Sequence, residues 1–414
     1  MNNAKRYPWI LVALLWVVAL LNYMDRQMLS TMKPSMQLDI HELQSAANFG
    51  YLMAIFLWIY GIMSPISGII ADHVNRKWLI IFSLFVWSAV TFTMGYANTY
   101  DEIYWLRALM GFSEALYIPA GLSLISEFHT NKTRSLAVGI HMSGIYMGQA
   151  LGGFGATFAT LFSWQKAFHS FGLIGIVYAV ILILFLKDDP KLKKINSSAI
   201  NTIKTPSITS LFKGVSLLLT NASFWVLLIY FAVPSLPGWG VKNWLPTLYA
   251  QNLHIDMSIA GPMSTITLAG SSLLGVIFGG ILSDRWSQKN IRGRVYTSAI
   301  GLFLTVPALF LISNGGSLFS VLAASFSFGF GFGMFDTNNM PILCQFVSAK
   351  YRATAYGLMN LVGVFSGAII TNILGKSSDN GNMNQVFIYL ALIVFLALII
   401  QLTFLRPKTN DYTD

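Results

Sequence analysis

Residues 68–77 read Gly-Ile-Ile-Ala-Asp-His-Val-Asn-Arg-Lys, and residues 280–285 read Gly-Ile-Leu-Ser-Asp-Arg. The second stretch repeats the glycine and the acid of the first with the same spacing. Counted from Asp72 to Asp284, the offset is 212 residues. Both stretches end an apolar segment, so they mark the same point in two copies of a larger unit.

Two further matches support a duplication. Residues 134–139 (Arg-Ser-Leu-Ala-Val-Gly) recur at 352–357 (Arg-Ala-Thr-Ala-Tyr-Gly) with an offset of 218, and Glu114-x4-Pro recurs as Asp336-x4-Pro with an offset of 222. Self-similarity at a nearly constant period is the signature of a repeated structural unit. The sequence therefore predicts two copies of one unit in the same chain.

The composition places both copies in a membrane. The chain has 414 residues, of which 55% are hydrophobic and 10% charged, with a mean hydropathy of +0.62. A soluble globular protein carries about 25% charged residues. This balance excludes a soluble enzyme, a disordered protein and a nucleic-acid-binding protein.

Twelve segments are long and apolar enough to cross a bilayer, for which about 20 residues are needed. We predict an all-α integral membrane protein with 12 transmembrane helices in two pseudo-symmetric six-helix bundles. The bundles are residues 1–187 and 223–414, and the polar, lysine-rich stretch 188–222 is the linker between them. The predicted spans are 9–33, 46–71, 77–98, 103–127, 133–161, 165–187, 223–250, 258–283, 294–313, 317–345, 352–374 and 384–405.

The basic residues predict the orientation. With both termini in the cytoplasm, 20 of the 26 Lys and Arg residues fall on the cytoplasmic side, and only Lys33, Lys166 and Lys376 lie outside. Cytoplasmic loops carry the excess of Lys and Arg, which also accounts for the net charge of +10 without a nucleic-acid partner. The short loops favour a bacterial inner membrane, and we expect a monomer.

The sequence lacks the motifs of an enzyme. It contains no P-loop, no His-Glu-x-x-His and no Gly-x-Ser-x-Gly. Cys344 is the one cysteine, so neither an intrachain disulfide nor a cysteine metal site can form. We predict no catalytic residue, no metal and no cofactor, and an ion gradient as the energy source.

The repeated stretch resembles the signature of the major facilitator superfamily, G-x3-D-[RK]-x-G-[RK]-[RK]. Residues 68–77 depart from it at His73 and Asn75. The resemblance implies transport by alternating access, with the substrate between the two repeats. It also implies gating or structural roles for Asp72, Arg76, Asp284 and Arg285, because the acid ends a helix where basic residues of a neighbouring loop can pair with it.

A closer resemblance is to the anion:cation symporter family, which includes sialin and bacterial hexuronate and galactonate transporters. It rests on Asn-Tyr-Met-Asp-Arg at 22–26, Arg-x3-Gly-x2-Glu-Ala at 107–115 and Trp-Leu-Pro-Thr at 244–247. The spinster-like transporters of lysolipids share the first two motifs. Residues 144–153 are also similar to the antiporter motif G-x3-G-P-x2-G-G, but Gln149 replaces its proline, which favours helix packing over drug efflux.

Six ionisable residues lie well inside the predicted spans, where a charge is costly and marks a functional candidate. Glu114 lies about 16 Å into its span at about 1.5 Å per residue. The cations Arg26 and Lys242 are 216 residues apart and occupy matching positions in the two halves, as do the acids Glu114 and Asp336. The six residues are Asp25, Arg26, Arg107, Glu114, Lys242 and Asp336.

This pattern predicts an organic anion held between Arg26 and Lys242. Arginine grips a carboxylate with two hydrogen bonds and lysine adds a point charge. Protonation of Glu114 could free its cation for the substrate, which would couple proton and anion binding. The alternative is two static ion pairs, Arg26–Glu114 and Lys242–Asp336.

The other candidates have narrower roles. We expect Asp25 and Asp336 to take part in proton coupling, and Asp25 with Arg107 to form a structural or gating pair. His141 is a further candidate proton carrier, and Pro237 with its neighbouring glycines could interrupt the helix before Lys242. Neutral side chains that could contact the substrate, or else join helices through hydrogen bonds, are Tyr23, Gln149, Asn338 and Asn360.

We therefore predict a secondary active transporter, most simply a proton-coupled symporter of a small organic anion such as a sugar acid. The alternatives are a spinster-like transporter of lysolipids or other amphiphiles, a drug efflux antiporter, and a receptor-like protein that binds without transport.

Overall fold

The computed structural model describes residues 3–129, 133–187, 215–348 and 351–409, and these residues form helices and short connections without strands. The first half contains α1 (Asn3–Asp39), η1 (His41–Gln44), α2 (Ala46–His73), α3 (Arg76–Met94), α4 (Tyr100–Ala115), α5 (Tyr117–Phe128), α6 (Arg134–Gly152), α7 (Gly155–Leu161) and α8 (Trp164–Phe185). The second contains α11 (Ala222–Leu253), α12 (Met257–Ser287), α13 (Gly293–Asn314), α14 (Leu318–Asp336), α15 (Asn339–Cys344), α16 (Arg352–Asp379) and α17 (Met383–Phe404).

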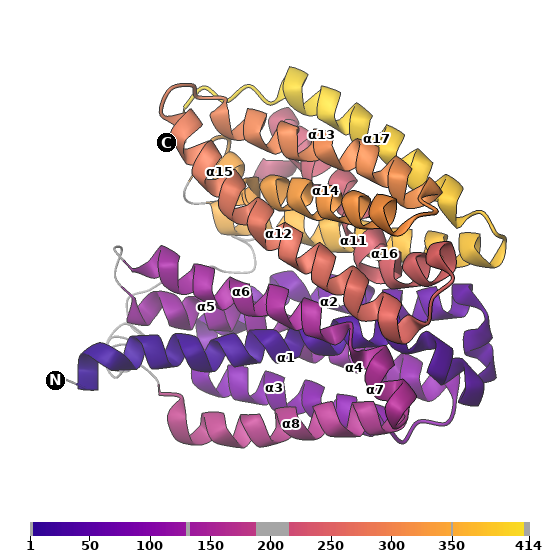
Figure 1. The fold of residues 1–414 in the computed structure, drawn as a ribbon. Coiled ribbons are helices and arrows are strands. Elements are labelled where there is room, and N and C mark those ends of the chain that lie inside the picture. Colours follow the sequence, from indigo (N-terminus) through magenta and orange to yellow (C-terminus); the bar gives the residue numbers. More distant parts are fainter. Residues whose placement is uncertain (1–2, 130–132, 188–214, 349–350, 410–414) are drawn as a thin grey trace.

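The helices form two bundles that lie side by side (Figure 1). Helices α1–α8 make the N-terminal bundle, drawn from indigo to magenta, and α11–α17 make the C-terminal bundle, drawn from red to yellow. Both chain termini lie at the same end of the molecule, which we call the terminal end; the opposite end is the distal end. Most of the predicted linker, residues 188–214, lies outside the described residues, so its boundaries stay a prediction.

Eleven segments of the described chain are long and apolar enough to cross a membrane. The remaining predicted span, 133–161, is folded as α6 and α7, which are separated by a short turn at Gly153 and Phe154. The predicted all-α fold with twelve membrane-crossing segments is therefore confirmed. The helices extend beyond several predicted ends, most clearly in α1, which runs from Asn3 to Asp39 where the sequence predicts 9–33.

The two halves break their fourth span at matching positions. In the first half α4 ends at Ala115, one residue after Glu114, and α5 begins at Tyr117. In the second half α14 ends at Asp336 and α15 begins at Asn339. In each half the helix is thus interrupted beside one of the two matching acids, Glu114 and Asp336. The duplication therefore extends to the local backbone geometry.

Helix α11 corrects one expectation. It is continuous from Ala222 to Leu253 although it contains three prolines. Spanning helices tolerate proline where neighbouring elements satisfy the freed carbonyl groups. The glycines serve close packing instead of an interruption, since a Cβ on Gly238 would lie 2.6 Å from the Phe332 ring.

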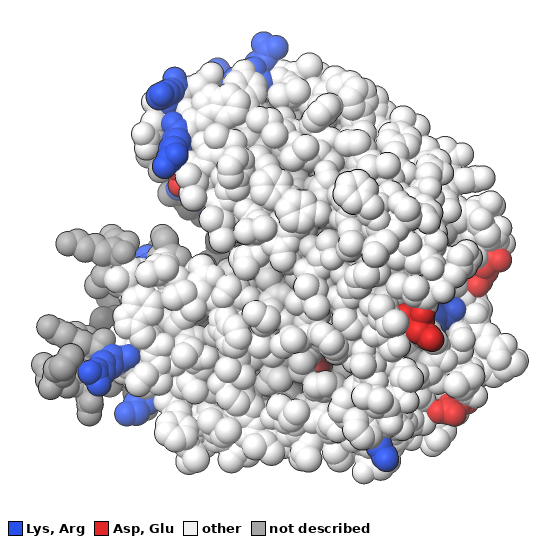
Figure 2. Space-filling model, viewed as in Figure 1, with Lys and Arg blue, Asp and Glu red and all other residues white. Residues whose placement is uncertain are grey.

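The bundles meet most closely at the distal end. Helix α2 packs along α16, and α6 and α7 pack against α12. A Cβ on Gly153 would lie 2.8 Å from the carbonyl of Gly261, and a Cβ on Gly375 would lie 2.6 Å from that of Ala46. Backbones therefore touch across the interface at this end, whereas Figure 2 shows a hollow between the bundles at the terminal end.

Surface charge also differs between the ends. In the view of Figure 2, most of the exposed Lys and Arg atoms lie at the terminal end and most of the exposed Asp and Glu atoms at the distal end. The wide surface between them shows almost no charged atoms in this view. This distribution agrees with a membrane belt around the middle and with the predicted cytoplasmic position of the termini, which stays a prediction.

Candidate functional site

An ion pair lies at the centre of the N-terminal bundle. Arg26 of α1 donates from Nε to Oε2 of Glu114 in α4 at 2.5 Å, and the two side chains are 9% and 0% exposed. A charge-assisted hydrogen bond of this kind is short and strong. The two residues come from separate spans, so the pair also fixes α1 against α4.

Aromatic rings enclose the guanidinium of Arg26. Its Cζ lies 4.8 Å from the ring centroids of Tyr23 and Phe56 and 4.6 Å from that of Tyr60. Cations are attracted to ring faces within about 6 Å, more so where water is excluded. The enclosure orients Arg26 and restricts the directions from which another anion can reach it.

Asp25 and Arg107 add a second opposite pair of charges to the same bundle, but they do not touch. Both are buried, and they lie within electrostatic reach of each other and of Glu114. Thr91 donates to Oδ2 of Asp25 at 3.4 Å, and Arg107 lies 4.7 Å from the Phe56 centroid. The two side chains therefore interact through space while making separate contacts, and their role as a structural or gating pair stays a prediction.

Lys242 lies across the interface from Arg26. Its Nζ is 5.3 Å from the ring centroid of Trp239 and 5.5 Å from that of Phe332. Its backbone carbonyl accepts a hydrogen bond from Gln27 of α1 at 3.0 Å, which joins the two bundles beside both cations. Lys242 is within electrostatic reach of Arg26 and of Asp336.

Asp336 differs from its N-terminal counterpart. Its side chain is exposed, and Oδ1 accepts from Nδ2 of Asn339 at 3.1 Å. Tyr230 in turn donates to Oδ1 of Asn339 at 3.0 Å. Among the described residues no cation lies within ion-pair distance of Asp336, so Lys242 and Asp336 are neighbours without direct contact.

The neutral candidates are placed as follows. Gln149 is buried in α6, and Asn338 is buried at the break after α14, where it donates to the carbonyl of Met334 at 2.8 Å. Asn360 of α16 donates to Oγ of Ser64 in α2 at 3.0 Å and so bridges the bundles. His141 is buried against the hydroxyl of Tyr117 at 2.7 Å.

The predicted gating residues lie at the terminal end. Arg76 forms an ion pair with Glu127 at the end of α5, and Asp284 accepts from Arg294 of α13 at 3.4 Å. Arg285 is exposed. The side chain of Asp72 lies outside the described part of the structure. In the second repeat, the acid near the end of α12 therefore pairs with a nearby basic residue.

Aromatic residues that were not predicted as site residues line the charges. Phe56 and Tyr60 lie four residues apart on one face of α2, and Trp239 and Phe332 flank Lys242. Aromatic residues make up 14% of the chain, so their presence carried no signal. The one signal in the sequence was the spacing of Phe56 and Tyr60, which are four residues apart and therefore lie on the same face of a helix.

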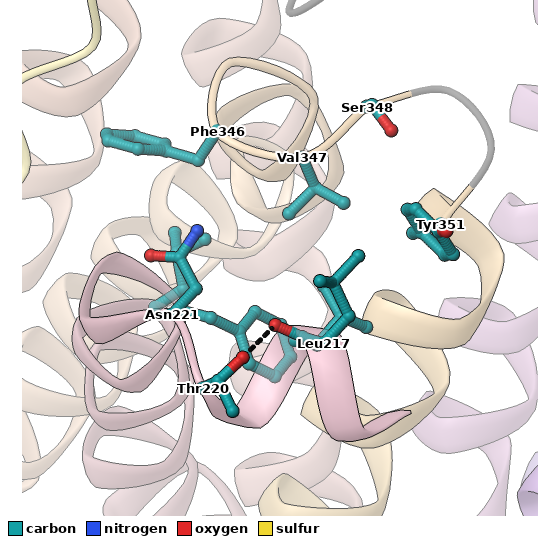
Figure 3. A pocket seen from close by; sticks show the side chains of 10 residues that line it. Leu217, Thr220, Asn221, Phe346, Val347, Ser348 and Tyr351 are labelled. Atoms are coloured by element: carbon teal, nitrogen blue, oxygen red, sulfur yellow. Dashed lines mark hydrogen bonds between the residues drawn. The ribbon is translucent and has the colours of Figure 1, made fainter. Parts of the chain in front are cut away.

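A separate cavity of about 350 Å³ lies at the terminal end of the C-terminal bundle (Figure 3). It lies between the start of α11 and the connection from α15 to α16, and the described residues that line it carry no charge. An organic anion needs a cation, so this cavity does not replace the central charges as the candidate site.

The sequence profile of the Major Facilitator Superfamily matches residues 15–372. The chain belongs to this superfamily. It is a transporter, not an enzyme. The chloroplastic ascorbate transporter of Arabidopsis thaliana is 26% identical over an alignment of 396 positions, which covers 92% of this chain and 72% of that protein. The hexuronate transporter of Escherichia coli (strain K12) is 25% identical over an alignment of 438 positions, which covers 99% of this chain and 96% of that protein.

The solved structure of a bacterial homolog of the human lysosomal transporter Spinster, in an inward-facing and unoccupied conformation, has the same fold. Its TM-score is 0.78 with 19% identity, and the match covers 99% of each chain. The comparisons thus confirm that the chain resembles both hexuronate transporters and spinster-like proteins. The sequence match to the hexuronate transporter covers nearly the whole chain. The likeness to the solved spinster homolog shows that the two proteins share a fold.

Proposed function

We propose that this superfamily member is a proton-coupled symporter of a small organic anion, working by alternating access, with the anion bound between Arg26 and Lys242. The observation that carries the proposal is the asymmetry of these two cations. Arg26 holds a buried carboxylate, whereas Lys242 faces it across the interface without a carboxylate in direct contact among the described residues.

The ion pair supplies a reason for proton coupling. A substrate carboxylate that binds Arg26 must displace Glu114, which is 0% exposed. Leaving a buried charge without its partner costs about 3–5 kcal/mol. Uptake of one proton by Glu114 removes that charge, so substrate and proton bind together. Asp25, buried in the same bundle, is the second proposed proton carrier.

The C-terminal half completes the site in this proposal. Lys242 provides the second positive charge for the anion, and the rings of Trp239 and Phe332 offer apolar faces beside it. The exposed carboxylate of Asp336 is open to solvent and can exchange a proton there. Tyr23, Gln149 and Asn338 supply neutral contacts, and Asn360 does so once its bond to Ser64 breaks.

A sugar acid is the substrate class that we propose. Its carboxylate suits the cations, and its ring suits the aromatic walls. The names of the relatives, a hexuronate transporter and an ascorbate transporter, support a small acidic sugar-derived compound. We further propose a monomer in a bacterial inner membrane with cytoplasmic termini, and gating by Asp72, Arg76, Asp284 and Arg285 with Arg107 in a structural role.

The test uses proteoliposomes loaded with a pH-sensitive dye. Sugar acids, other carboxylates, neutral sugars and lysolipids are added in turn, and entry of protons is followed. We expect one class of sugar acid to acidify the lumen in the native protein and not in Glu114→Gln. Acidification by neutral sugars, or transport of lysolipids alone, would contradict the proposal.

A further inference from the structure

The first turn of α2 is held by a residue of the other bundle. The first N–H groups of a helix have no partner within the helix. Asp379, the last residue of α16, accepts from the backbone N–H of Ala46 at 2.6 Å and of Ala47 at 2.9 Å, and from the hydroxyl of Ser45 at 2.7 Å. One carboxylate of the C-terminal bundle thus caps a helix of the N-terminal bundle.

This contact differs in kind from the other hydrogen bonds between the bundles. Gln27, Thr157, Thr265 and Asn360 also bond across the interface, but through neutral groups. A carboxylate at a helix N-terminus gains from the positive end of the helix dipole and from the charge on the acceptor. The three bonds of Asp379 therefore act together on one helix end.

The surroundings place this contact where the bundles are closest. A Cβ on Gly50 would lie 2.9 Å from the carbonyl of Thr371, so α2 and α16 approach through their backbones just beyond the cap. Lys33, near the end of α1, is within electrostatic reach of Asp379, and Lys376 lies 5.4 Å from the ring centroid of Tyr51.

We propose that Asp379 is the latch of the distal gate: its bonds to the first turn of α2 hold the distal end closed, and their release is a step of transport. Asp379 is a positioning residue, because it lies at the end of the bundle away from the central charges. Alternating access requires α2 and α16 to part at this end.

The exposure of the latch makes it reversible. Asp379 is exposed in the closed state, so its carboxylate can be hydrated as soon as the helices separate. The N–H groups of Ala46 and Ala47 then also meet water. A buried ion pair at this position would instead resist opening. The contact is thus strong enough to bias the closed state and accessible enough to break in each cycle.

The experiment measures opening directly. In a Cys344→Ser background, Thr265→Cys places a thiol on α12 at a position that is 2% exposed and bonded to Ala150 across the distal interface. A membrane-impermeant maleimide is added from the distal side of proteoliposomes, and the labelling rate is compared among latch variants. The native chain has no other cysteine.

We expect Asp379→Ala to raise the distal labelling rate roughly tenfold, within the usual range for coupling between two states. Asp379→Asn should raise it less because one acceptor oxygen remains, and Asp379→Glu should restore a low rate. The matched control is Asp256→Asn, since Asp256 is also exposed at the distal end of a helix but caps nothing with its side chain.

Equal labelling of Asp379→Ala, Asp379→Asn and the parent would overturn the latch. If Asp379→Ala fails to fold, the labelling rates of the isosteric Asp379→Asn and of Asp379→Glu still test the latch. The assay needs neither substrate nor a proton gradient, so a negative result leaves the proposed symport untouched. A failed symport test likewise leaves the latch in place.

Discussion

The two halves of the central site have matching charges but use them differently. In the N-terminal half, Arg26 and Glu114 are in direct contact, nearly buried and surrounded by three rings. In the C-terminal half, Lys242 and Asp336 are neighbours without contact, and Asp336 is exposed. The difference shows that duplication preserved the positions of the charges while the side chains around them diverged.

The backbone does not cause this difference. Both halves break a span within two residues of the acid, at Leu116 and at Thr337–Asn338. In the second half Asn339 donates to Asp336 and is itself held by Tyr230, so a neutral network replaces the cation. The N-terminal half thus holds a buried charge pair, whereas the C-terminal half keeps a half-buried lysine apart from an exposed carboxylate.

The largest expected effect is from Arg26→Ala. It leaves the buried carboxylate of Glu114 without its partner, which costs about 3–5 kcal/mol, and it removes the proposed substrate cation. We expect substrate affinity, measured by calorimetry, to fall at least about a hundredfold, with a loss of thermal stability. The double variant Arg26→Ala with Glu114→Gln should regain the stability but not the binding. Recovery of both would show that Arg26 serves only to neutralise Glu114.

Glu114→Gln is the next change in size, and it tests the charge pair as a proton switch. The amide keeps the shape of the side chain but cannot release a proton. We expect exchange of substrate across the membrane to continue, whereas uphill accumulation driven by a pH gradient is lost. The control is Gln401→Ala, which removes a buried neutral group that bonds the carbonyl of Val295 and has no place in the proposed site. Retained proton-driven accumulation in Glu114→Gln would assign coupling to another acid.

Lys242→Gln should have a smaller effect, because no carboxylate in the described part of the chain is in direct contact with Lys242 and would be left unpaired. We expect KM to rise about tenfold, equivalent to about 1.4 kcal/mol, with little change in thermal stability. Asp336→Asn should alter KM less than Lys242→Gln does. Uptake kinetics give KM, and melting curves give the thermal stability. Similar losses of stability in Lys242→Gln and Arg26→Ala would show that the charges of the two halves are equivalent.

The sequence predicted the fold well because the fold depends on long apolar segments and on a repeat, both of which are one-dimensional signals. It also located the charges, since an ionisable residue within an apolar span is conspicuous. It offered both ion pairs as an alternative, but it could not predict that the Arg26–Glu114 pair forms while Lys242 and Asp336 stay apart, because this depends on how the helices are rotated. The role of Asp379 was equally hidden, since an acid at the end of a span is ordinary.

Asn360 provides the smallest effect and the finest test of the interface between the halves. Its amide bonds to Ser64 here, and we propose that it contacts the substrate once the bundles move. A neutral hydrogen bond contributes about 0.5–1.5 kcal/mol, so Asn360→Ala should raise KM about threefold, while Ser64→Ala should leave it unchanged. If both single variants and the double variant instead show the same small change in uptake, the cycle assigns Asn360 to helix contact alone. In that case the proposed substrate site of the C-terminal half no longer includes Asn360 and consists of Lys242 and the side chains beside it.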